Sequence, residues 1–279
     1  MRMLGQALKY LFRNFYVIAL YALPASIAFA LKFNHSSFLE YLFNLSREQN
    51  RTLLEVYAEF SLLPLQSLWL CLLWSVAVIV TFCLMFGYTE RHMKYGVRDL
   101  WRPFKSVNFS VLTIAPAFIV IVVIEELFAF FCALFINLFS LSQGAFIIVL
   151  LPMIYGLMMC LLFLAYALIA LWMPVRMLTG YTNRDAIRYS IRLSSGRLMR
   201  TMVGLMFPLL VTSPFMLILH RFSTLRALNV VFYVLCYTFI AGYIVAYTMT
   251  VYFSLTGAER KDIKPNIFKK VKHSGKKSA

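Results

Sequence analysis

Two adjacent glutamates, Glu125 and Glu126, are the side chains of this sequence that packing alone explains least. They fall near the middle of an apolar stretch over residues 111–139. An ionisable group within hydrocarbon costs several kcal/mol, so it normally faces protein, water or a binding partner. Neighbouring helical residues point about 100° apart, so at most one of the two is expected to face the bundle centre, while the other packs at a seam between helices.

The glutamate pair has a functional and a structural interpretation, and the sequence leaves both open. The functional one is a proton or cation site, or a ligand for a cationic group of a substrate. The structural one is a carboxyl group hydrogen-bonded between helices. No Lys, Arg or Asp falls within the predicted spans to complete a relay. The candidate hydrogen-bonding neighbours are Asn137, Tyr155, Tyr166, Tyr237, Thr238 and Tyr243.

Motifs for known catalytic chemistry are not found in the sequence. The four histidines stand apart at 35, 92, 220 and 273, and no H-E-x-x-H motif occurs. There is no G-x-S-x-G motif and no Gly-rich phosphate loop. The three aspartates, Asp99, Asp185 and Asp262, are far apart in sequence, which disfavours a metal site for lipid-phosphate transfer. We therefore predict no catalytic residue, no metal ligand and no cofactor.

The elements that position Glu125 and Glu126 are membrane spans. The chain is 62% hydrophobic and 14% charged, far more apolar than a soluble domain. We predict an all-α, polytopic transmembrane bundle of six spans with short amphipathic interfacial helices, in which residues 1–255 form the membrane domain. Residues 256–279 are predicted to form a basic, disordered cytoplasmic tail. The predicted spans are 15–31, 62–88, 111–139, 146–175, 202–219 and 230–255.

The distribution of basic residues predicts the orientation of these spans. Of the 27 Lys and Arg residues, all but Lys32, Arg47, Arg51, Arg221 and Arg226 fall on one side. The positive-inside rule assigns that side, with both termini, to the cytoplasm. The net charge of +16 is explained in the same way, so we expect no nucleic acid partner. The run Ala28-Phe29-Ala30 also fits a signal-peptide cleavage site, but a retained first span is favoured by its membrane-crossing length.

The outward segment 32–61 is predicted to hold two short amphipathic helices. Ser37 with Glu40, and Thr52 with Glu55, have the spacing of capping boxes. We expect the helices to lie on the membrane surface or to cap the bundle, and a partner-binding site is the functional alternative. The expected apolar faces are Phe38, Tyr41, Leu42 and Leu45 in the first helix, and Leu53, Val56, Tyr57 and Phe60 in the second.

Two inner loops carry candidate contacts to anionic lipid. Basic residues of the first recur every three or four positions, a spacing that keeps their charges on one helical face, although Gly96 and Pro103 argue against one uninterrupted helix. In the second, Thr182 is predicted to start a basic amphipathic helix that Gly196 ends and that rests against the inner leaflet. The candidate contacts are Arg91, Lys94, Arg98, Arg102 and Lys105 in the first loop, and Arg184, Arg188 and Arg192 in the second.

The end of the fourth predicted span and the loop after it carry a family resemblance. The run Pro174-Val-Arg-Met-Leu-Thr-Gly180, then Ala186-Ile-Arg-x-Ser190, then Gly196 before a further apolar span, resembles bacterial six-helix proteins. These belong to the superfamily named for the membrane domain of glycerophosphodiester phosphodiesterase, and the likeness extends in outline to most of the chain. It implies a bacterial cytoplasmic membrane and a non-enzymatic role, because the family's catalysis belongs to a separate soluble barrel.

Three functions follow from the sequence in order of preference. The first is a non-enzymatic accessory or scaffold protein whose basic cytoplasmic face engages anionic lipid headgroups, or a membrane or cytoplasmic protein partner. The second is a small transporter or channel subunit that uses Glu125 or Glu126. The third is an intramembrane lipid-modifying enzyme. No internal repeat suggests inverted halves, which weakens the transporter hypothesis.

Overall fold

The computed structural model describes residues 2–32, 52–65, 67–105, 107–140, 146–222 and 226–263. Within these ranges the chain is helical, with turns and short connections but no strand. Six of the described helical stretches are long and apolar enough to cross a membrane. The protein is therefore an all-α polytopic membrane bundle, which confirms the predicted fold class.

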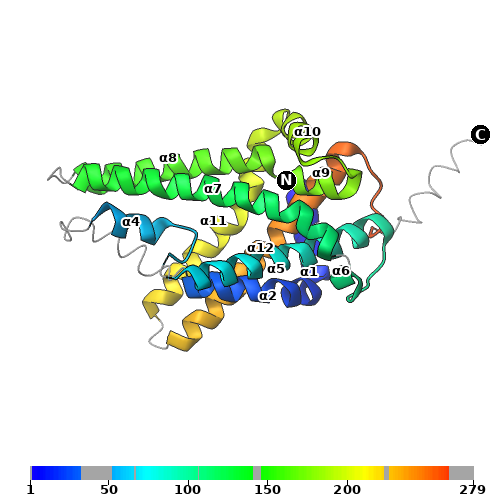
Figure 1. The fold of residues 1–279 in the computed structure, drawn as a ribbon, viewed down its shortest axis with the longest axis horizontal. Coiled ribbons are helices and arrows are strands. Elements are labelled where there is room, and N and C mark those ends of the chain that lie inside the picture. The colour runs from blue at the N-terminus through cyan, green and yellow to red at the C-terminus, as the bar shows by residue number, and fades with distance from the viewer. Residues whose placement is uncertain are drawn as a thin grey trace, which may run out of the picture.

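The order of the helices along the chain can be followed in Figure 1. The six spans use α2, α5, α7, α8 with α9, α11 and α12, and the other helices are short or lie at the ends of the bundle. The elements are α1 (Arg2–Arg13), α2 (Phe15–Lys32), α4 (Leu53–Phe60), α5 (Leu68–Tyr95), α6 (Arg102–Lys105), α7 (Val107–Ser140), α8 (Phe146–Ile169), α9 (Trp172–Thr179), α10 (Asn183–Ser195), α11 (Leu198–Phe222) and α12 (Arg226–Thr256).

Helix α12 lies at the centre of the bundle and packs against α1, α2, α5, α9 and α11. Gly242 permits the close approach of α2, because a Cβ at this position would lie 2.7 Å from the Ile18 side chain. Deeper in the same seam, the Thr238 hydroxyl donates to the Ser26 hydroxyl over 3.0 Å. The small residue within the pattern Gly242-x-x-x-Ala246 thus serves packing inside the bundle. Its partner α2, the first span, is an integral part of the core.

The fourth predicted span, 146–175, is in fact two helices, α8 and α9. The break has a local cause in Pro174, which has no N–H to donate to the Ala170 carbonyl four residues earlier. Helix α9 starts afresh at Trp172, so Pro174 lies in its first turn, where a missing donor costs little. Helix α9 then ends at Gly180, whose φ of 75° is readily available only to glycine.

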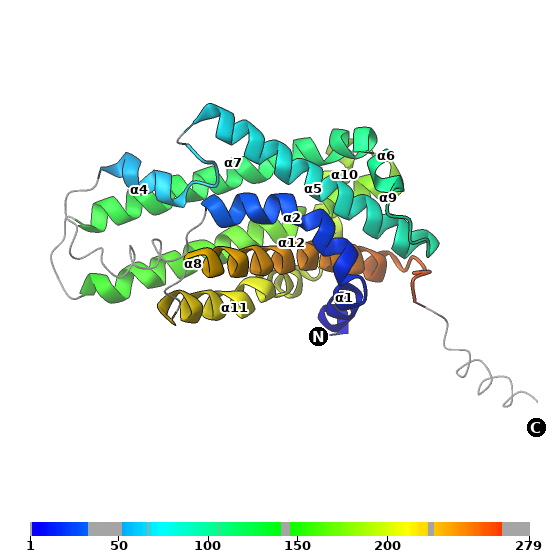
Figure 2. The same ribbon diagram turned by 90° about the horizontal axis from the view of Figure 1, so that it is seen from below.

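The bundle has two unlike ends (Figures 1 and 2). At one, here called the α4 end, α4 lies beside the long α7 and α8, which extend beyond the start of α5. At the other, the α10 end, α1, α6, α9 and α10 gather with the chain's last described residues. Helix α7 has 34 residues, and at 1.5 Å per residue its length of about 51 Å exceeds the roughly 30 Å of bilayer hydrocarbon.

Candidate functional site

Glu126 is an acceptor for three hydrogen bonds from the segment around the end of α4. The Tyr57 hydroxyl donates to Oε2 over 2.6 Å. The Ser61 hydroxyl and the Leu63 amide donate to Oε1 over 3.0 and 3.1 Å. Two side chains and one backbone group thus converge on a single carboxylate that is more than sixty residues away in sequence. We call Glu125, Glu126 and the groups bonded to them the α4–α7–α8 junction.

Helix α4 is capped at its start and bonded to α2 near its end. At its start, the Thr52 hydroxyl accepts from the Glu55 amide while Glu55 accepts from the Thr52 amide, which confirms the second predicted capping box. At its other end, Lys32 Nζ at the end of α2 donates to the Ala58 carbonyl over 3.2 Å. The free amides and carbonyls of an eight-residue helix are thus partly satisfied. The helix predicted around Ser37 and Glu40 lies outside the described residues.

The face that α4 turns inward is the predicted one. Val56 is buried, and Leu53, Tyr57 and Phe60 are half-buried against the bundle, while Leu54 is exposed. Tyr57 combines a ring on this face with a hydroxyl that reaches Glu126. Burial, and next the hydrogen bond to Glu126, raise the pKa of Tyr57 to about 12. Both effects favour the protonated phenol, which is the form that can donate.

Glu125 faces a different seam, between α7 and α8. The Tyr166 hydroxyl of α8 donates to Glu125 Oε1. Nearby, the Tyr155 ring lies 6.2 Å from the rings of both Phe60 and Phe128, so that aromatic side chains of α4, α7 and α8 meet beside the carboxylates. The two glutamates therefore serve separate seams, as their angular separation on a helix requires.

The two glutamates lie at the middle of the third candidate span, Ile114–Leu138, as the sequence predicts. They are also central in α7. Glu126 contacts Ser61 and Leu63, which precede the start of α5 at Leu68.

Only part of the predicted polar neighbourhood assembles at the junction. Tyr166 bonds to Glu125, and Tyr155 is close by. By contrast, Thr238 bonds to Ser26, and the Tyr243 ring stacks 5.6 Å from Tyr247 within α12. The sequence analysis missed two residues that bond to Glu126, Tyr57 and Ser61. A signal was present for Tyr57, because a hydroxyl on the apolar face of an amphipathic helix needs a partner once that face is buried.

The residues of the first basic loop do not share one helical face. Helix α5 ends at Tyr95, where Gly96 has a φ of 73°, and the separate helix α6 follows at Arg102–Lys105. This confirms the interruption predicted from Gly96 and Pro103.

The Arg98 Nε donates to His92 Nε2 over 3.3 Å. Because arginine only donates, His92 Nδ1 carries the ring hydrogen and donates to the Tyr10 hydroxyl over 3.1 Å.

Helix α10 has the start and end predicted for it. The Thr182 hydroxyl accepts from the Asp185 amide, and Gly196 is the C-cap. A stripe of small residues, Ala186, Ser190 and Ser194, is buried, and the Ser190 hydroxyl donates to the Leu168 carbonyl over 2.9 Å. With this stripe facing the bundle, the three arginines Arg184, Arg188 and Arg192 are exposed.

All eight candidate lipid contacts thus lie at the α10 end, on the end of α5, on or before α6, and on α10 (Figure 1). In the described part of the chain, no three His, Cys, Asp or Glu side chains gather to hold a metal ion. The sequence and structure were compared with family models, curated proteins and solved structures, and none of the three comparisons gives a match.

Proposed function

We propose that this chain is a non-enzymatic integral membrane protein, an accessory or scaffold unit whose basic end engages anionic lipid headgroups or a partner protein. The observation that carries the proposal is the gathering of α1, α6 and α10, all rich in basic residues, at one end of the bundle (Figure 1). In the cell this end faces the cytoplasm, with both termini, by the positive-inside rule. The resemblance to bacterial six-helix proteins supports a bacterial cytoplasmic membrane.

The structure of the α10 end suits a surface at headgroup level. Arg184, Arg188 and Arg192 are one helical turn apart and exposed. Each basic residue near an anionic membrane surface contributes about 1 kcal/mol of attraction. At the same end, Trp101 and Phe104 expose more than half of their surfaces, as interfacial aromatic residues do. Exposed cations and exposed aromatic rings at the same end of the bundle suit the boundary between headgroups and acyl chains.

A triple substitution on α10 tests this proposal. Replacing Arg184, Arg188 and Arg192 together by glutamine removes three charges while the buried stripe of α10 is unchanged. The unfolding temperature of the purified protein is measured with anionic phosphatidylglycerol and with zwitterionic phosphatidylcholine. We expect the intact protein, and a matched Arg→Lys triple variant, to be stabilised more by the anionic lipid, and the glutamine variant to lose most of this difference.

The salt dependence provides the control for that experiment. Attraction between exposed charges is screened at high ionic strength, so the preference for anionic lipid should decline as salt is added. An equal preference in the glutamine and lysine variants, unaffected by salt, would overturn the lipid part of the proposal. A soluble partner remains a separate outcome, detected by crosslinking at the same end of the bundle.

The second candidate function is a small transporter or channel subunit. It is supported by the two carboxyl groups at the α4–α7–α8 junction, which lie next to each other within a candidate span. Glu125 bonds to Tyr166 within a span, which is a position suited to binding a proton or cation between helices. Against it, Glu126 already serves three donors that hold α4.

Flux measurements separate the two candidates. Proteoliposomes containing the intact protein, Glu125→Gln or Glu126→Gln are assayed for fluxes of protons and monovalent cations. A transporter requires flux in the intact protein that Glu125→Gln abolishes without unfolding the bundle. The accessory role instead predicts no flux in any of the three proteins.

A further inference from the structure

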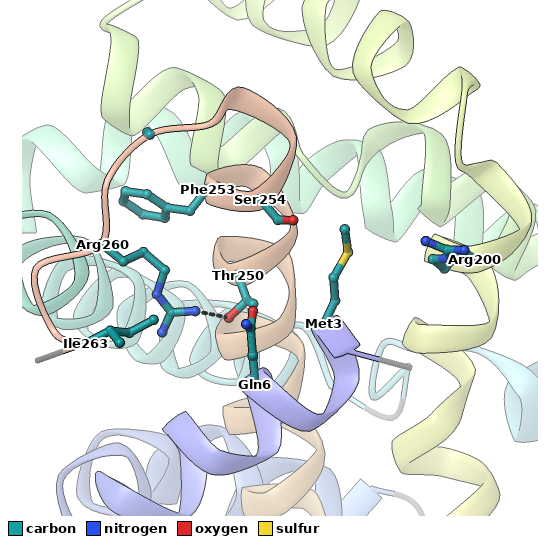
Figure 3. A pocket seen from close by; sticks show the side chains of 9 residues that line it. Met3, Gln6, Arg200, Thr250, Phe253, Ser254, Arg260 and Ile263 are labelled. Atoms are coloured by element: carbon teal, nitrogen blue, oxygen red, sulfur yellow. Dashed lines mark hydrogen bonds between the residues drawn. The ribbon is translucent and has the colours of Figure 1, made fainter. Parts of the chain in front are cut away.

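A pocket of about 390 Å³ opens at the α10 end between four parts of the chain (Figure 3). Met3 and Gln6 of α1 form one side, and Arg200 near the start of α11 faces them. The last turns of α12 and the residues after it complete the wall, which includes Arg260. This volume lies within the range of roughly 300–1,000 Å³ that small-molecule sites occupy.

Arg260 is a fixed guanidinium in the pocket wall. Its Nε and Nη2 donate to the two Asp262 carboxylate oxygens over 3.1 and 2.8 Å. Its Nη1 donates to the Thr250 hydroxyl over 3.3 Å (Figure 3). Its Cζ also lies 5.8 Å from the centre of the Tyr10 ring. A guanidinium has five N–H groups, so two remain available beyond these bonds. The arginine is thus immobilised without using all of its donors.

Arg200 supplies the uncompensated positive charge. Its side chain is exposed, and no carboxylate pairs with it among the described residues. The position of its backbone is fixed, because the Tyr247 hydroxyl of α12 donates to the Arg200 carbonyl over 3.1 Å. Since Asp262 balances Arg260, the pocket carries a net positive charge with Gln6, Thr250 and Ser254 as further polar groups.

The place of the pocket in the bundle indicates where its ligand comes from. Two candidate spans reach their limits here, one beginning at Leu198 and the other ending at Thr256. Arg200 and Ser254 therefore lie within one turn of the ends of membrane-crossing helices, at the depth of phospholipid headgroups. Met3, Phe253 and Ile263 add apolar surface beside the polar groups. A phosphate ester that carries an apolar group would contact both kinds of surface.

We infer that this pocket binds a phosphate group beside the Arg200 guanidinium, with Gln6, Thr250 and Ser254 as further polar partners, and that the phosphate belongs to an anionic phospholipid. A guanidinium suits phosphate because its N–H groups match the phosphate oxygens. The inference rests on the proposed function, which assigns the α10 end to the headgroup layer. It goes further by replacing a diffuse surface attraction with one saturable site.

The test compares Arg200→Gln with Arg197→Gln, which removes the same charge from an exposed residue that does not line the pocket. Native mass spectrometry and calorimetry in detergent measure the binding of a short-chain phosphatidylglycerol and, separately, of inorganic phosphate. We expect one saturable lipid site that Arg200→Gln weakens by about ten-fold or more, as the loss of a charge-assisted hydrogen bond predicts. Arg197→Gln should change the affinity by less than about two-fold.

The remaining outcomes each decide a point. If inorganic phosphate binds and the lipid does not, and Arg200→Gln abolishes that binding, the pocket takes a soluble phosphate compound and the lipid assignment is overturned. Equal affinity in the two variants, or no saturable binding of either probe, overturns the site itself. The α10 triple glutamine variant keeps the pocket. If it loses the salt-dependent preference for anionic lipid but still binds lipid at one saturable site, both the surface proposal and the pocket proposal are supported. If the α10 triple variant keeps its preference for anionic lipid while Arg200→Gln loses saturable lipid binding, the surface proposal is overturned and the pocket proposal is supported.

Discussion

The Glu126 carboxylate is the point on which the docking of α4 depends, because it accepts from Tyr57, Ser61 and the Leu63 amide. We expect Glu126→Ala to lower the free energy of unfolding by about 3 kcal/mol, since three donors lose a charged acceptor at once. Urea or thermal unfolding in detergent measures the loss. Limited proteolysis should also show faster cleavage between residues 61 and 65.

A smaller change at the same site is the matched control. Tyr57→Phe removes one donor and keeps the ring in its place, so its cost should be about 1 kcal/mol. If Glu126→Ala and Tyr57→Phe had equal effects, Ser61 and Leu63 would contribute nothing to the docking, contrary to the observed geometry.

Tyr57 also makes the docking of α4 sensitive to alkaline pH. Its pKa is raised to about 12 in the folded protein by burial and by Glu126, whereas the ordinary value is near 10. A group with a raised folded pKa stabilises the fold fully below its unfolded pKa, and this stabilisation is lost as pH rises through the folded value. We therefore expect α4 to loosen between about pH 10 and pH 12.

Hydrogen exchange of the α4 amides, or proteolysis of the segment that follows, can measure this transition. The Tyr57→Phe protein has no phenol to ionise, so it should lack the pH-dependent component. If α4 of the Tyr57→Phe protein still loosens between about pH 10 and pH 12, a group other than Tyr57 causes the loosening.

Between helices, the seam of α11 and α12 has no spare room at Gly204. A Cβ built there would lie 2.0 Å from the Tyr247 hydroxyl oxygen, whereas one at Gly156 of α8 would meet no atom within 4 Å. Gly204→Ala should therefore displace Tyr247 and destabilise the bundle by about 1–3 kcal/mol, as overpacking does. Gly156→Ala should be neutral or slightly stabilising. Unfolding temperatures of the two variants, measured in the same detergent, test the contrast.

The helices themselves are the part of this structure that the sequence predicts well. Apolar runs of membrane-crossing length locate the six spans, and the Thr52 and Thr182 caps locate the starts of α4 and α10. Pro174 indicates a helix break near it, but the residues on both sides of it are apolar, so the hydropathy pattern does not show the break. A span defined by hydropathy alone therefore runs through the break between α8 and α9.

The candidate site was predicted only in part, for a physical reason. The presence of Glu125 and Glu126 in an apolar run is a local signal, and it correctly marked residues with polar partners. The identity of those partners depends on which helices become neighbours and on how far α7 extends beyond α5. These are properties of tertiary packing between residues some 41 to 69 positions apart, which no spacing in the sequence encodes.

Considered as a whole, the molecule has one strongly basic end, and this asymmetry yields a topology prediction. We expect Leu54→Cys, on the exposed face of α4, to react with a membrane-impermeant maleimide in intact bacterial cells. Ser195→Cys, exposed at the end of α10, should react only after the membrane is permeabilised. The reverse pattern would contradict the proposed orientation, and the unsubstituted chain provides the background reading.

The bonds from Tyr57 and Ser61 to Glu126 also impose an order on biosynthesis. A ribosome delivers α4 and the first two spans before it has made the third, because Ser61 precedes Glu126 by 65 residues. Throughout that interval α4 has no carboxylate to bind, although Lys32 of the first span can already donate to its Ala58 carbonyl. The arrival of α7 is therefore the step that locks the early part of the chain, so a ribosome stalled before residue 126 would leave α4 open to protease.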